Sequence, residues 1–126
     1  GASVSEMLSN SRMAKNIYES DFSAGFFEYL QRLPARIALF QNYPNPFNPA
    51  TVIRYQLPDM GETRTLPVQL TVYNVLGQAV ATLVNEPQEA GYKTVTFDSH
   101  GLPTGVYFYK LIAGNSTYVR KMILAR

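Results

Sequence analysis

The sequence predicts an all-β fold, an antiparallel β-sandwich of about seven strands, preceded by an N-terminal helical segment. Three observations predict it. After Pro34 the apolar residues recur with a period of two, as in strands that bury one face. Glycine, proline and asparagine interrupt this pattern at short intervals, without helical patterns between the breaks. The 126 residues are 46% hydrophobic and 16% charged, a composition that suits a folded domain with its own core.

A helical pattern precedes the strands. Ser3 and Glu6 fit a capping box, in which each side chain satisfies an amide left free at a helix start. The apolar residues from Met7 to Tyr18 recur at steps near three and four, as on one face of a helix. Pro34 ends the pattern, because proline disfavours helical geometry at the residue before it.

This change of pattern divides the chain in two. The opening Gly1-Ala2-Ser3 looks like the scar of a tag. We therefore expect 1–32 to be that scar and a helical segment or linker from a preceding region of a longer protein. The sandwich is expected to occupy 33–126.

Seven strands are predicted after Pro34. In the second, Ile53, Tyr55 and Leu57 alternate with polar residues, as on a strand with one buried face. The sixth is apolar on both faces, which is typical of a central strand. The predicted ranges are 36–41, 51–57, 67–74, 78–84, 92–98, 105–113 and 117–125.

The stretch QNYPNPFNP lies between the first two predicted strands. Pro44, Pro46 and Pro49 lack amide hydrogens, so this stretch cannot form a central strand. Each Asn-Pro pair favours a turn. We expect a rigid crossover that covers one open end of the core, with Tyr43 and Phe47 as apolar anchors.

Charge and composition argue against several classes of function. A net charge of +2, with Arg120-Lys121 as the only adjacent basic pair, predicts no nucleic-acid partner. No apolar run approaches the roughly 18 residues of a spanning helix, so no membrane insertion is expected. The chain has no cysteine, and His100 is its one histidine, in a turn-like setting that predicts a surface residue. Without a nucleophile elbow, a phosphate loop or zinc-ligand spacing, we expect no enzyme, no catalytic residue, no metal and no cofactor.

Several motifs follow one another in an order that resembles a known family. In this order they are similar to the C-terminal sorting domain of proteins exported by the type IX secretion system of Bacteroidetes and related Gram-negative bacteria. The resemblance runs from about Leu33 to Arg126. A similar immunoglobulin-like module occurs in the flagellar hook-capping protein, so the fold alone does not decide the function. The motifs are ALFQNYPNPFNP at 38–49, TVIRY at 51–55, VYNVLGQ at 72–78, AGY at 90–92, GVYFY at 105–109 and RKMIL at 120–124.

The resemblance implies a secretion signal attached to a larger cargo domain upstream. Such domains fold in the periplasm as a small immunoglobulin-like antiparallel β-sandwich, dock on the outer-membrane translocon, and travel with their cargo to the medium or the cell surface. A sortase-like cysteine protease commonly removes the domain and exchanges it for a surface anchor. The implied partners are therefore the type IX translocon, this protease and the covalent cargo, without cofactors.

The family's motifs map onto a set of candidate recognition residues. Two departures are visible: Phe97 stands before Asp98 where many relatives have tryptophan, and the chain closes on Arg126 rather than the commoner lysine. These leave the details of recognition open. The candidate residues are Pro44, Asn45, Pro46, Phe47, Gly77, Gly105, Tyr107, Arg120 and Lys121.

Several of these residues also have a physical interpretation. Gly77 is expected at positive φ in a tight hairpin, and Gly105 in a turn where a Cβ would clash or strain the backbone. Tyr107 is expected to pack in the core with its hydroxyl hydrogen-bonded. Arg120 and Lys121 occupy successive strand positions, so they lie on opposite faces and only one easily serves a given docking surface.

Two other functions fit a β-sandwich. Nine tyrosines allow a carbohydrate-binding module, although sugar platforms often use tryptophan and this chain has none. A passive assembly or spacer domain, like the hook-capping module, is the other alternative. If the last strand lies at a sheet edge, its backbone groups could pair with a partner, as we also expect from the sorting interpretation.

Overall fold

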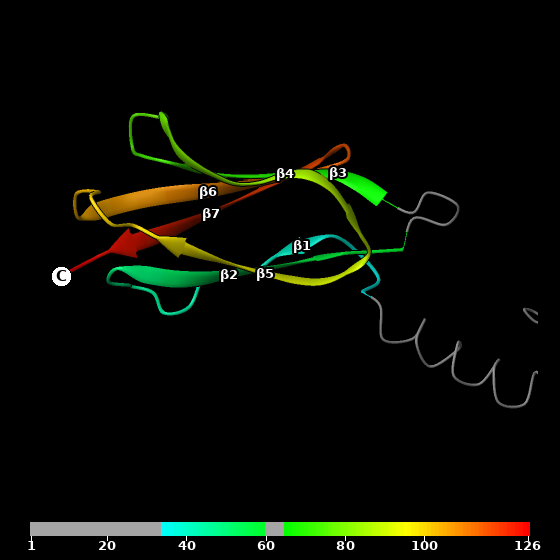
Figure 1. The fold of residues 1–126 in the computed structure, drawn as a ribbon, viewed down its shortest axis with the longest axis horizontal. Helices are drawn as coiled ribbons and strands as arrows, with labels where there is room; N and C mark the ends of the chain where they lie inside the picture. The colour runs from blue at the N-terminus through cyan, green and yellow to red at the C-terminus, as the bar shows by residue number, and fades with distance from the viewer. Residues whose placement is uncertain (1–33, 60–64) are drawn as a thin grey trace, which may run out of the picture. The chain divides into compact units, whose positions relative to one another are not determined.

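The computed structural model describes residues 34–59 and 65–126, which form two antiparallel β-sheets packed face to face (Figure 1). The expected helical segment at 1–32 lies outside the described residues. Within them, no helix has the length and apolar character that a membrane crossing requires.

The described strands are seven, and their arrangement is that of an immunoglobulin-like sandwich, as predicted. One sheet has the order β1-β2-β5 and the other the order β4-β3-β6-β7. The sixth strand lies between two others, as its apolar faces indicated. The strands are β1 (Ala38–Leu39), β2 (Ala50–Leu57), β3 (Thr65–Tyr73), β4 (Ala79–Glu89), β5 (Gly91–Asp98), β6 (Gly105–Ala113) and β7 (Ser116–Leu124).

The core lies between the sheets, because alternate side chains of each strand point inward. On β2 the inward residues are Ile53, Tyr55 and Leu57, each at most 2% exposed. The other buried apolar residues are Leu39, Phe47, Leu66, Val68, Leu70, Val72, Phe97, Tyr107, Tyr109, Leu111, Ala113, Met122 and Leu124.

Strand β4 continues five residues beyond its predicted end, through Pro87. Pro87 lies opposite Pro67 of β3. The Pro67 carbonyl oxygen accepts a bond from the Gly114 amide, on the side of β3 away from β4. The two prolines therefore form a non-hydrogen-bonded pair. Because no amide at these positions would bond across the β3–β4 ladder, the prolines remove no hydrogen bond from it.

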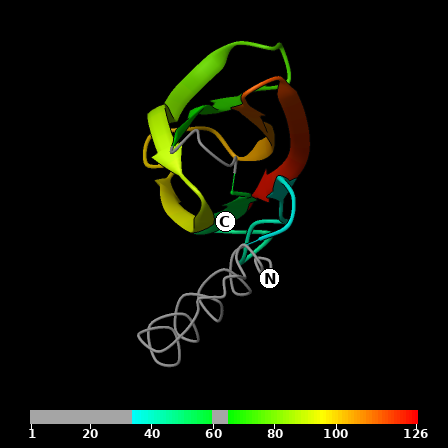
Figure 2. The same cartoon turned by 90° about the vertical axis from the view of Figure 1, so that its right-hand side faces the viewer.

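The two long sides of the sandwich are closed differently. On one side, only Ala90 separates β4 in one sheet from β5 in the other, so the chain itself joins the sheets (Figure 2). On the other side, β7 lies near β1. There the Nε of Arg120 donates to the Leu39 carbonyl oxygen at 2.8 Å, which links the sheets through a side chain.

Candidate functional site

The proline-rich stretch docks on the end of β7. The Phe47 amide donates to the Ile123 carbonyl oxygen, and the Ala125 amide donates to the Phe47 carbonyl oxygen, both at 3.0 Å. The Asn45 side-chain oxygen accepts from the Ile123 amide at 2.9 Å. The first and last family motifs, more than 70 residues apart in sequence, are therefore held together by backbone and amide hydrogen bonds.

Phe47 anchors this stretch as expected, but Tyr43 does not. The Phe47 ring is 2% exposed and meets the Phe97 ring edge-on, with the ring centroids 6.0 Å apart. Tyr43 is 76% exposed, so its expected role as an apolar anchor is wrong. Its backbone pairs with Val52, which faces outward between two buried neighbours on β2. Residues directly opposite in an antiparallel pair share a face, so the Tyr43 ring is directed to solvent.

A buried polar network holds the base of the stretch. Asn42 is 2% and Thr51 1% exposed. The Asn42 amide nitrogen Nδ2 donates to Thr51 Oγ1 at 3.0 Å and to the Pro44 carbonyl oxygen at 3.1 Å. Thr51 Oγ1 donates to the same carbonyl oxygen at 2.8 Å. Neither residue was predicted from the sequence, because strand periodicity assigns polar side chains to the exposed face.

Tyr109 connects this network to the second sheet. Its hydroxyl accepts from the Asn42 backbone amide at 2.8 Å and donates to the Phe40 carbonyl oxygen at 2.7 Å. The side chain is fully buried. Burial raises the pKa of the Tyr109 hydroxyl above its ordinary value of 10.0, because the phenolate is poorly solvated there. The neutral tyrosine therefore bridges the two sheets below the proline-rich stretch.

The candidate glycines lie in turns, with one part of the expectation corrected. Gly77 has φ of +81° in the β3–β4 turn, as predicted. Gly105 has φ of +146°, a conformation that strains residues with a Cβ. No atom lies within 4 Å of a Cβ built on Gly105. Strain, and not a clash, is therefore the reason for glycine at this position.

Tyr107 packs and bonds as predicted. It is 4% exposed, and its hydroxyl donates to the Pro103 carbonyl oxygen at 2.6 Å. This bond ties the start of β6 to the loop before it.

Arg120 and Lys121 point to opposite sides of β7. Arg120 lies opposite the buried Tyr109 and reaches the Leu39 carbonyl oxygen on the inner side. Lys121 lies opposite Phe108, is exposed, and faces outward. Its backbone oxygen accepts a bond from the Gln41 side-chain amide at 2.8 Å. Of the two cations, Arg120 has a structural role and Lys121 leaves its side chain on the surface.

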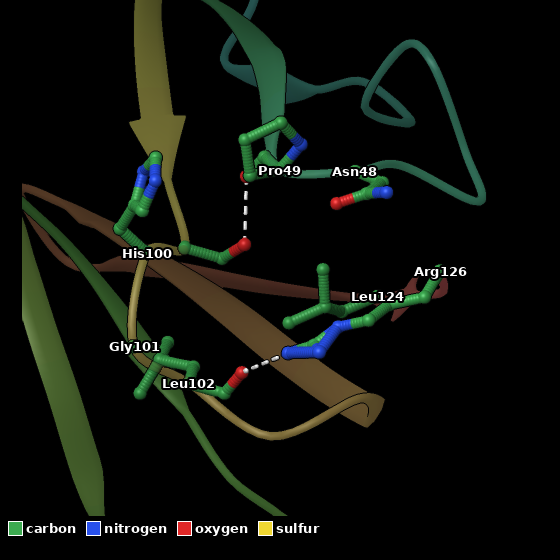
Figure 3. A pocket seen from close by; sticks show the side chains of 8 residues that line it. Asn48, Pro49, His100, Gly101, Leu102, Leu124 and Arg126 are labelled. Carbon is green, nitrogen blue, oxygen red and sulfur yellow. Dashed lines mark hydrogen bonds between the residues drawn. The ribbon is translucent and has the colours of Figure 1, made fainter.

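A hollow of about 210 Å³ lies beside the end of β7 (Figure 3). The Ser99 hydroxyl donates to the Pro49 carbonyl oxygen at 2.7 Å, while His100 Nδ1 lies 2.9 Å from Asp98 Oδ1. Ser99 and His100 thus lack the mutual hydrogen bond of a nucleophile and its base. The pKa of the Asp98 carboxyl is lowered mainly by a hydrogen bond from the His100 backbone amide, and further by a hydrogen bond from the His100 side chain. The lining residues are Asn48, Pro49, Ser99, His100, Gly101, Leu102, Leu124 and Arg126.

The candidate residues gather toward one end of the sandwich. Gly105 at the start of β6 lies opposite Leu124 at the end of β7, and Phe47 forms a bridge to Leu124. The β3–β4 turn with Gly77 extends from the same end, but on the other sheet from the proline-rich stretch (Figure 1). The proline-rich stretch, the loop before β6 and the end of β7 line one hollow and thus form one composite surface.

Comparison with known protein families finds a match over about two thirds of the chain. Residues 41–125 match a family model described as "Secretion system C-terminal sorting domain". No curated protein matches the chain. The matched range begins in the proline-rich stretch and ends one residue after β7.

Proposed function

The chain belongs to the family of secretion system C-terminal sorting domains, and we propose that its folded sandwich, as a unit, is the address that the type IX machinery reads. As a member of this family, the domain is a sorting signal for type IX secretion. It associates with that secretion system and directs an upstream cargo to the outside of the cell.

One observation carries the proposal of a folded address. The family pattern begins at residue 41 and ends at residue 125, and these two regions meet through the bonds between Asn45, Phe47 and the end of β7. A receptor that reads a linear tail would need only the last motif. A receptor that reads the composite surface needs both regions, which are adjacent only in the folded state.

Further steps follow from this proposal. The domain folds in the periplasm before it docks, and it performs no chemistry of its own. A sortase-like cysteine protease then removes it, with cleavage ahead of β1, where Ala35 and Arg36 are exposed. Residues 1–32 belong to the cargo side of this cut, and 33–126 form the sorting domain.

Export of a fluorescent protein tests the address. Residues 1–126, and separately 33–126, would be fused behind a signal peptide and a fluorescent protein in a host with the type IX machinery. We expect both fusions to reach the medium or cell surface, and to stay in the periplasm of a strain without the translocon. Periplasmic retention of both fusions in both strains would overturn the proposal. Retention of the shorter fusion alone would show that the sandwich is insufficient.

Folding dependence needs a separate control. Phe47→Asp places a carboxylate in the core beside Phe97 and is expected to unfold the sandwich, while leaving the last motif intact. If the folded unit is read, this fusion stays in the periplasm. Export of a demonstrably unfolded Phe47→Asp fusion would instead indicate a linear signal.

A further inference from the structure

The outer edge of β7 is covered along only half of its length. Alternate residues of an edge strand direct both backbone groups away from the sheet. At the end of β7 these groups are used within the domain, by Asn45 and Phe47 at Ile123 and by Gln41 at Lys121. The same alternation makes Thr117 and Val119 the next outward residues. In the part of the chain that the structure describes, their outward backbone groups meet no partner.

This free half has no proline, no bulge and no irregular register to protect it from pairing. Prolines, bulges and irregular register commonly blunt such edges. The opposite edge strand, β4, carries Pro87 and has two register shifts against β3. Strand β7 pairs with β6 in an unbroken register over its whole length. Thr117 and Val119 are β-branched, which favours extended backbone.

The outer face beside this edge is apolar and cationic. Val119 is 56% and Ile123 37% exposed. Lys121 lies opposite Phe108, and Lys110, opposite Val119, places its ammonium 5.1 Å from the centre of the Tyr73 ring. Strands β3, β6 and β7 contain no carboxylate residue. The face therefore offers positive charge on an apolar background without an acidic group of its own strands.

We propose that a translocon component docks here by adding an extended strand beside Thr117–Val119, with apolar and acidic side chains over the outer face. The free backbone groups can form hydrogen bonds with an extended segment that pairs beside them. The lysines attract acidic side chains on that segment. A second copy of this chain is a poorer occupant, because its β7 would bring Arg120 and Lys121 without any carboxylate. The inference rests on the proposed function, since it identifies how the address is read.

A single proline substitution tests the strand pairing. Val119→Pro removes an outward amide that the β6–β7 ladder does not use, so it is compatible with the fold of an edge strand. Val119→Thr keeps the amide and the branched shape and is the matched control. Point variants are preferable to deleting β7, which supplies Met122 and Leu124 to the core.

The readout is translocon-dependent export of the fluorescent fusion of residues 1–126. We expect Val119→Pro to lower export about tenfold, from loss of a backbone hydrogen bond and of strand docking around it. Val119→Thr is expected to export like the wild type. Wild-type export of a folded Val119→Pro protein would overturn the inference and leave the proposed function standing. Failure of the wild type itself would instead overturn the proposed function.

Charge reversal on the outer face tests the docking proposal independently. It remains a valid test if Val119→Pro fails to fold. The double variant Lys110→Glu/Lys121→Glu changes two exposed or partly exposed residues of the outer face. We expect it to lower export about tenfold through repulsion of the acidic segment. Lys93→Glu, on the other sheet, is the control and is expected to export normally. Equal export of the double variant and the control would contradict the acidic partner.

Discussion

The side-chain oxygen of Asn45 accepts a hydrogen bond from the backbone amide of Ile123 at 2.9 Å, although 78 positions separate the two residues in sequence. The bond joins the proline-rich stretch to the last strand. Together with the bonds from Phe47 to Ile123 and from Gln41 to Lys121, it covers one half of the β7 edge.

Asn45→Ala removes this bond while leaving the proline-rich backbone unchanged. We expect the free energy of unfolding to fall by about 1 kcal/mol, the usual net contribution of such a bond. Urea unfolding followed by circular dichroism measures it. Asn48→Ala, an exposed asparagine that also precedes a proline, is the matched control and should change stability by less than about 0.5 kcal/mol. Equal effects of the two substitutions would contradict a specific role for the Asn45 bond.

Phe47→Ala and Tyr43→Ala separate the buried from the exposed aromatic of the same stretch. Phe47 is 2% exposed and packs against Phe97, so its truncation should cost about 3–5 kcal/mol. Tyr43 is 76% exposed, and its truncation should cost less than about 0.5 kcal/mol. Thermal and urea unfolding of both variants would measure the difference. A large loss in Tyr43→Ala would mean that its ring packs on the domain after all.

Tyr109→Phe removes the hydroxyl that bridges the two sheets and retains the ring. The Asn42 amide and the Phe40 carbonyl oxygen would lose their partner, which we expect to cost about 2 kcal/mol. Tyr118→Phe is the control, because Tyr118 is 40% exposed at the strand edge. Stabilities of both variants from urea unfolding, compared with the wild type, test the prediction. A neutral Tyr109→Phe would show that water replaces the hydroxyl.

Alkaline pH should destabilise the domain through its buried tyrosines. Burial raises the pKa of both Tyr55 and Tyr109 above 10.0 in the folded state. Between the unfolded and folded pKa values the unfolded chain binds fewer protons, so the free energy of unfolding falls as pH rises. The part of the free energy of unfolding that comes from these neutral tyrosines is fully present below about pH 10, and it is lost as pH rises through the folded-state pKa.

Urea unfolding at several pH values from about 8 to about 11 measures this dependence. The free energy of unfolding should fall less steeply with rising pH in Tyr109→Phe than in the wild type. This difference in slope does not depend on how stable the two proteins are at about pH 8. An unchanged slope in this variant would show that Tyr109 does not contribute to the alkaline loss.

Local pattern predicted most of the strands, and its failures have identifiable causes. The period-two alternation located β2 and β6 almost to the residue. Strand β4 continues past its predicted end because Pro87 lies at a position where the ladder needs no amide. Asn42 and Thr51 were missed because a polar residue is buried only when the fold brings it a partner.

By itself, the sequence determined the sandwich class, the position of nearly every turn, and the family to which the domain belongs. Each depends on local chemistry: side-chain alternation, the conformational freedom of glycine, and motifs of adjacent residues. Only the tertiary structure decided that Phe47 points inward and Tyr43 outward, and that Arg120, unlike Lys121, donates a side-chain hydrogen bond to the other sheet. Alternation identifies residues that share a face, but which face is buried depends on packing between segments far apart in sequence. The half-covered edge of β7 arises in the same way, because the proline-rich stretch that covers it comes from the other end of the domain.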